Sequence, residues 1–110
     1  MRIDELNEDK IGQILTYLAS TDDAFAEAKG ALESAEILRK RVRARAWIDS
    51  EGTAGERQAE AEVADDTQAA DDAYIAAKVA FEKLKAKRER GGLLIDIWRT
   101  LEASRRRVMA

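Results

Sequence analysis

The 110-residue sequence contains no cysteine, no histidine and no proline, and aromatic residues make up only 5% of it. Without cysteine there is neither a disulfide framework nor thiolate chemistry. Without histidine, the commonest acid–base group and metal ligand is missing. No glycine-rich phosphate motif and no nucleophile–base pair occurs, and the acidic doublets at 65–66 and 71–72 are typical of a solvated helix face. These absences argue against an enzyme, and we expect no catalytic residue, no bound metal ion and no cofactor.

Long apolar runs and a strong excess of one charge are also lacking. No run approaches the roughly 20 residues that span a bilayer, and the first residues, Met1 to Glu5, lack the apolar core of a signal peptide. Charged residues make up 37% of the chain, yet the net charge is only −3. The field of the whole molecule therefore favours neither nucleic acid nor an acidic partner. We expect a cytoplasmic protein that has no membrane partner.

The sequence is rich in the residues of long helices, with a single cluster that indicates a turn. That cluster, Ser50 to Glu56, combines two glycines with hydroxyl residues. Thr53 suits the N-cap of a following helix, with Glu56 completing a capping box, and Gly52 suits the left-handed end of the preceding one. We predict one domain over residues 1–110, with a helix at about 7–50, a loop at about 51–53 and a helix at about 54–107.

Apolar and small residues recur at alternating steps of three and four on both sides of this turn. The first series is Ile11, Ile14, Leu18, Thr21, Phe25, Ala28, Leu32, Ala35, Arg39, Val42 and Ala46. The second series is Val63, Thr67, Ala70, Tyr74, Ala77, Phe81, Leu84, Arg88, Gly91, Ile95 and Trp98. The pattern predicts an all-α fold, a long antiparallel two-helix hairpin of the coiled-coil type.

A turn near Thr53 also predicts which residues of the two helices meet, because paired residue numbers should then total about 106. The predicted pairs include Ile11 with Ile95, Leu18 with Arg88, Leu32 with Tyr74 and Val42 with Val63. The basic run from 39 to 45 faces the acidic start of the second helix in this register, and residues 105–107 face the acidic N-terminus. Complementary charge blocks favour this orientation of the hairpin.

Gly91 and Gly92 leave two alternatives open. They could break the second helix and separate a third one, or they could let a neighbouring helix approach closely. The heptad phase continues from Leu84 to Ile95 without a skip, which favours a continuous helix.

The segment from 93 to 101 is apolar on several faces, and one partner helix cannot cover it. We expect a second copy of the hairpin to complete a four-helix bundle, with a different protein as the alternative partner. The predicted interface residues are Leu15, Leu93, Leu94, Ile97, Trp98 and Leu101.

Two basic strips allow contact with nucleic acid, because clustered cations displace counterions from phosphates. The candidate residues are Arg41, Arg43, Arg45, Arg99, Arg105 and Arg106. The alternative is that facing carboxylates neutralise them. Trp47 also has two interpretations. As an exposed aromatic side chain it could stack on a base or anchor a partner, whereas as a structural residue it could fold over the turn and seal it.

The stretch from Lys87 to Arg106, with Gly91-Gly92 and Trp98 at its centre, resembles the C-terminal part of small uncharacterised helical-hairpin proteins of bacteriophages and prophages. Residues 47–57 are similar to their turn. The resemblance implies the host cytoplasm and an accessory role in early DNA metabolism or recombination, and it identifies no active residue. We therefore predict a non-enzymatic phage accessory protein that acts as a protein-interaction or structural coiled-coil module. The alternative partner to a second copy is then a phage or host protein. The alternative is a nucleic-acid-binding accessory protein in phage recombination or replication.

Overall fold

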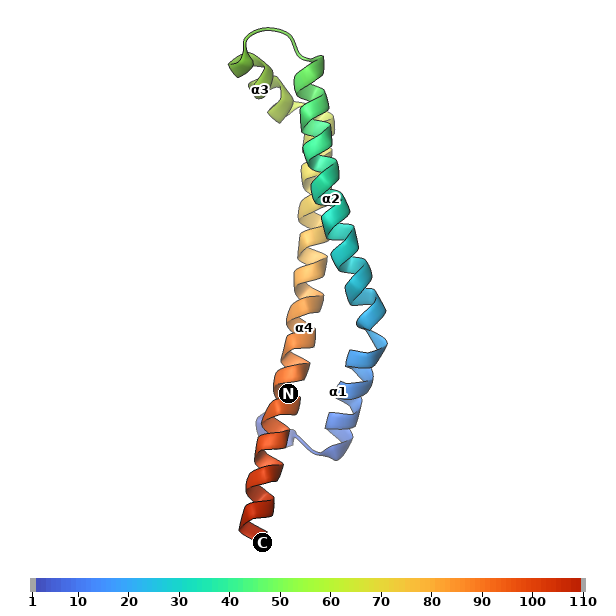
Figure 1. The fold of residues 1–110 in the computed structure, drawn as a ribbon, viewed down its shortest axis with the longest axis vertical. Helices are drawn as coiled ribbons and strands as arrows, with labels where there is room; N and C mark the ends of the chain where they lie inside the picture. Colours follow the sequence, from blue (N-terminus) through green and yellow to red (C-terminus); the bar gives the residue numbers. More distant parts are fainter. Residues whose placement is uncertain (1, 110) are drawn as a thin grey trace. The chain divides into compact units, whose positions relative to one another are not determined.

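The computed structural model describes residues 2–109, which form helices and connecting turns with no strand among them. The elements are a short 3-10 helix η1 (Ile3–Glu5) and the helices α1 (Glu8–Ser20), α2 (Asp22–Asp49), α3 (Ala54–Val63) and α4 (Asp65–Met109) (Figure 1). The chain divides into two compact units, which we call unit 1 (residues up to Phe25 and from Lys83 on) and unit 2 (Ala26–Glu82). Both contain an antiparallel helix pair, so the prediction of an all-α helical hairpin is confirmed.

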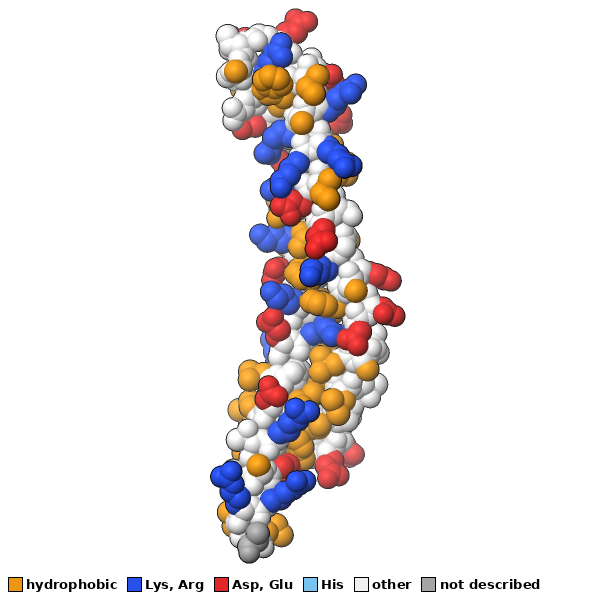
Figure 2. All heavy atoms as spheres, in the orientation of Figure 1, with side chains coloured by type: hydrophobic (Ala, Val, Ile, Leu, Met, Phe, Trp, Pro, Cys, Tyr) orange, Lys and Arg blue, Asp and Glu red, His pale blue; other side chains and the backbone are white. Residues whose placement is uncertain are grey.

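In unit 1, α1 packs against the C-terminal part of α4. Ile11, Ile14 and Ile95 form a buried cluster. Leu6, Leu18, Leu94 and Trp98 pack around that cluster. Hydrophobic side chains gather over α1 and the facing part of α4 in Figure 2. The predicted neighbours Ile11 and Ile95 share this core, so the register expected from the heptads is confirmed in unit 1.

The predicted single helix from about 7 to 50 is wrong, because it is interrupted at Thr21. Asn7 caps the start of α1 by accepting a hydrogen bond from the Lys10 N–H at 2.9 Å. At the other end the Thr21 hydroxyl donates to the Tyr17 carbonyl at 2.7 Å, and α2 begins at Asp22. Residues 20–23 are Ser-Thr-Asp-Asp, whose short polar side chains compete with the helix for backbone hydrogen bonds.

Arg88 of α4 holds this interruption together. Its guanidinium donates to the Leu18 carbonyl at 2.8 Å and to the Thr21 hydroxyl at 2.6 Å. It also pairs with the Asp22 carboxylate at 2.6 Å and lies 5.1 Å from the centre of the Phe25 ring. The prediction placed Arg88 opposite Leu18, and the structure adds the reason that a charged residue occupies the seam. A helix end left with free carbonyls needs donors, and Arg88 supplies them.

The two adjacent glycines do not break α4, which continues through them. Gly91 is buried, and a Cβ there would stand 3.2 Å from the Ile14 Cγ2 atom. Gly92 has nothing within 4 Å of that position. Gly91 therefore lets α1 approach α4 closely, which is the second of the two alternatives given for the glycines, and the helix does not break there.

In unit 2, the turn contains the predicted cap. The Thr53 hydroxyl accepts a hydrogen bond from the Glu56 N–H at 3.2 Å, so its role as N-cap of α3 is confirmed. Gly52 has a φ of 110°, in the left-handed region, but it stands beyond the end of α2 at Asp49. Ser50 closes α2 instead, since its hydroxyl donates to the Ala46 carbonyl at 2.7 Å.

The predicted second helix is also interrupted, at Ala64, whose backbone is extended. As a result α3 is a separate helix that folds back beside the end of α2 (Figure 1). The predicted contact of Val42 with Val63 is wrong, because Val63 is 66% exposed. The residues buried in this region are the small side chains Ala61, Thr67 and Ala70.

The insertion of α3 changes the register of unit 2. The Arg39 guanidinium lies 4.0 Å from the centre of the Tyr74 ring, and Arg43 pairs with Asp71 at 3.2 Å. These residue numbers total 113 and 114 instead of about 106. Tyr74 thus meets Arg39, which stands seven positions beyond its predicted partner Leu32. The whole segment from Ser50 to Ala64 acts as the turn, and its centre lies near residue 57.

Replacing Gly52 with alanine is expected to lower the free energy of unfolding by about 1–2 kcal/mol, because a side chain there requires an unfavourable φ and would meet Glu56. Gly55→Ala is the control, since it lies in α3 with nothing within 4 Å of its Cβ position. Urea denaturation followed by circular dichroism measures both. Equal midpoints for the two variants would show that the turn places no demand on residue 52.

Candidate interaction surfaces

A row of apolar side chains lies on the side of α4 opposite the core of unit 1. Leu93 and Ile97 stand two residues before and after the buried Ile95, which places each about 160° around the helix from it. Leu101 follows one turn later. Leu93 is 59% exposed and Leu101 is 44% exposed, while Ile97 is half-buried. We call Leu93, Ile97 and Leu101 the outer row.

The other residues predicted at the interface lie elsewhere. Leu94 and Trp98 pack against the core cluster, so they help to hold α1 on α4. Leu15 is 50% exposed on α1. Asp96 and Thr100 line a shallow hollow of about 240 Å³ together with Ile97 and Leu101 of the outer row. The predicted set therefore divides into core residues and exposed residues, and only the exposed ones are available to a partner.

Three of the six candidate phosphate-binding arginines form ion pairs. Arg43 pairs with Asp71 at 3.2 Å, Arg45 with Asp49 at 3.3 Å and Arg105 with Glu102 at 2.9 Å. Arg41, Arg99 and Arg106 have no carboxylate within 4.0 Å among residues 2–109.

The predicted facing of charge blocks is seen only in part. In unit 1, Arg88 of α4 pairs with Asp22 at the start of α2. Arg105 pairs with Glu102 of its own helix and not with the acidic N-terminus. Arg99 and Arg106 line a hollow of about 350 Å³ together with Glu8, which belongs to the acidic N-terminal region. In unit 2, the carboxylate of α4 that pairs with the basic run of α2 is Asp71, which binds Arg43. It lies further along the sequence than the predicted acidic block at 60–66.

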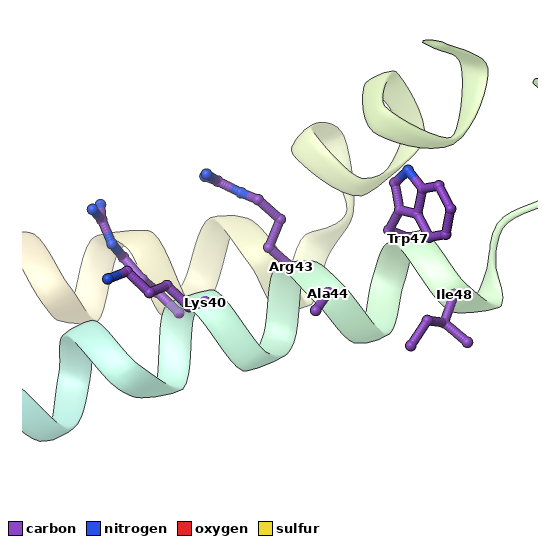
Figure 3. A pocket seen from close by; sticks show the side chains of 6 residues that line it. Lys40, Arg43, Ala44, Trp47 and Ile48 are labelled. Carbon is purple, nitrogen blue, oxygen red and sulfur yellow. The ribbon is translucent and has the colours of Figure 1, made fainter. Parts of the chain in front are cut away.

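An open groove of about 600 Å³ lies along one side of α2 in unit 2. We call it the α2 groove, and its lining residues are Arg39, Lys40, Arg43, Ala44, Trp47 and Ile48. Figure 3 shows that the Trp47 ring points toward α3. The Arg57 guanidinium of α3 lies 5.1 Å from the centre of that ring, and Trp47 is still 39% exposed. Trp47 thus contacts the turn region and also borders the groove.

Sequence reasoning did not identify Lys40, Ala44 and Ile48 as parts of one surface. The signal was present as spacings of three and four from Ala44 to Lys40, Trp47 and Ile48, which place residues on neighbouring positions of a helix face. It was overlooked because this face lies outside the heptad seam.

Within residues 2–109, no group of three or more acidic side chains is placed to hold a metal ion, and no helix is long and apolar enough to cross a membrane. Comparison with protein-family models, curated proteins and solved structures found no match to this chain.

Proposed function

We propose that this chain is a non-enzymatic coiled-coil module, encoded by a bacteriophage or prophage and active in the host cytoplasm, that works through protein–protein contacts. Its first partner is a second copy of itself, bound through the outer row of α4. The observation that carries this proposal is that Leu93, Ile97 and Leu101 repeat every four residues on the side of α4 turned away from the core.

The energetics of the outer row support self-association. Full burial of one leucine or isoleucine side chain contributes about 1.5–3 kcal/mol. A twofold symmetric pairing brings the same row from both copies into contact, so each of the three side chains contributes twice. Antiparallel pairing of two hairpins produces the four-helix bundle that the sequence predicts.

The test is sedimentation of the wild type and of a Leu93→Glu, Ile97→Glu variant. We expect the wild type to sediment as a dimer at micromolar concentration and the variant as a monomer, because buried carboxylates would have no partner. Leu94 is left unchanged, since it packs against the core. The control is Gln13→Glu, Thr16→Glu, which adds the same two charges at exposed positions of α1 and should remain dimeric. A monomeric wild type would refute the proposal.

Nucleic-acid binding is the second candidate function, and the observation in its favour is that Arg41, Arg99 and Arg106 lack carboxylate partners among the described residues. The same sedimentation experiment is repeated with labelled single-stranded DNA. If the protein acts through protein–protein contacts alone, the labelled DNA should not sediment with it. DNA that sediments with the protein at about 0.15 M salt, and is released when Arg41, Arg43 and Arg45 are changed to alanine, would favour the second candidate instead.

A further inference from the structure

We infer that the α2 groove is a docking site for an acidic amphipathic helix of a partner protein. This site belongs to unit 2, whereas the outer row belongs to unit 1. Binding in the groove does not depend on self-association through the outer row, and the two can be tested separately.

The groove retains positive charge after its contacts within unit 2 are counted. Arg39 lies over the Tyr74 ring and has no carboxylate within 4.0 Å among residues 2–109. Lys40 meets Glu36 at 3.6 Å, with the two side chains 71% and 44% exposed, so solvent screens that pair strongly. Arg43 has Asp71 at 3.2 Å. The cations outnumber the carboxylates, and an acidic ligand would complement them.

The floor of the groove is apolar. Ala44 and Ile48 lie one turn apart, Trp47 stands beside them, and Ile48 is 64% exposed. An apolar centre with charged side chains at its edge is the usual anatomy of a protein–protein interface, in which tryptophan and arginine contribute most of the affinity. Figure 3 shows these side chains together on α2.

The shape and length of the groove favour a helix as the occupant. Its lining runs from Arg39 to Ile48, a rise of about 14 Å along α2, which matches helical anchors at positions i, i+3 or i+4, and i+7. A nucleic-acid strand would need successive aromatic platforms for its bases. The lining of the groove contains one aromatic residue, Trp47, and the nearby Tyr74 ring lies under Arg39.

The first test measures the binding of a fluorescein-labelled synthetic helix of about four turns, with leucines at i, i+3, i+4 and i+7 and glutamates elsewhere, by fluorescence anisotropy. Lys40→Glu should raise the Kd about tenfold. Arg41→Glu is the matched control, because it changes the charge equally at the next residue, outside the groove, and should change the Kd less than about twofold. Equal weakening by both variants would overturn the inference, since it would show general charge attraction.

The second test addresses the apolar floor. Ile48→Ala should raise the Kd of the same peptide about fivefold, whereas Ile37→Ala, also exposed on α2 but outside the groove, should leave it unchanged. Circular dichroism verifies that both variants keep their helix content.

Two further outcomes would overturn the inference in favour of another occupant. A labelled oligothymidylate that binds the wild type more tightly than the peptide, and is weakened by Lys40→Glu but not by Arg41→Glu, would assign the groove to nucleic acid. Loss of the wild-type dimer in sedimentation of Lys40→Glu would assign the groove to the second copy. If the outer row fails its own test while the peptide results are as expected, only the self-association proposal falls.

Discussion

Replacing Arg88 with methionine is expected to lower the free energy of unfolding by about 2–3 kcal/mol, the cost typical of losing hydrogen bonds made by a largely buried charged group. The Arg88 side chain is 18% exposed, and its guanidinium binds the Leu18 carbonyl, the Thr21 hydroxyl and the Asp22 carboxylate. Methionine keeps much of the packing volume of the aliphatic stem, so the loss reports on the hydrogen bonds. Asp22 is 67% exposed, and its ion pair contributes the smaller part.

Urea denaturation followed by circular dichroism measures the effect. Arg90→Met is the control, because Arg90 is exposed on the same helix and forms no ion pair with another residue in the described range. Arg88→Lys should give an intermediate loss, since one ammonium group cannot reach all three acceptors with the geometry of a guanidinium. If Arg88→Met and Arg90→Met unfold at the same urea concentration, Arg88 does not hold the junction of α1 and α2.

Gly91→Leu and Gly92→Ala are expected to change stability in opposite directions although the two glycines are adjacent. Gly91→Leu should destabilise unit 1 by about 2–3 kcal/mol, because its Cβ alone would stand 3.2 Å from Ile14 and 3.5 Å from Leu18, and the rest of the side chain would force α1 away. Gly92→Ala should stabilise α4 by about 1 kcal/mol, since its Cβ meets nothing within 4 Å and alanine is the better helix former.

Thermal unfolding of the two single variants and of the wild type gives the comparison. Gly91→Ala serves as the intermediate case, because its gain in helix propensity is offset by the close contact with Ile14. A melting temperature for Gly91→Leu at or above that of the wild type would mean that α1 does not approach α4 closely at this position. A destabilised Gly92→Ala would mean that its side of the helix is covered.

Much of the fold follows from local patterns. The heptad series requires helices with one apolar stripe each, and the pairs of unit 1, Ile11 beside Ile95 and Leu18 beside Arg88, match the pairing predicted for those stripes. The N-cap at Thr53 follows from its short polar side chain. The exposed outer row agrees with the prediction that residues 93–101 are too apolar for one partner. Of the residues predicted at the interface, Leu94 and Trp98 pack against the core cluster, and for Trp98 this agrees with its place in the heptad series.

The two helix interruptions could not be read from periodicity. The first heptad series passes through Thr21 without a skip, and the second series begins at Val63 and steps to Thr67 across Ala64, so the spacing marks neither interruption. At Thr21 the balance between helix and turn depends on Arg88, which is 67 positions away in the sequence. The separation of α3 displaces the pairing in unit 2 from a total of about 106 to 113 and 114, and it leaves Val63 exposed.

The sequence by itself determined that this protein is helical, that its helices pair antiparallel and that α4 has more apolar surface than one neighbour can cover. Those properties depend on spacing along one helix, and spacing is visible in the chain. Only the tertiary structure decided that Arg88 closes the junction at Thr21 and that Lys40, Ala44, Trp47 and Ile48 border a groove. Such features depend on which side chains neighbouring helices already cover, a balance of packing and hydrogen bonding that no local pattern contains.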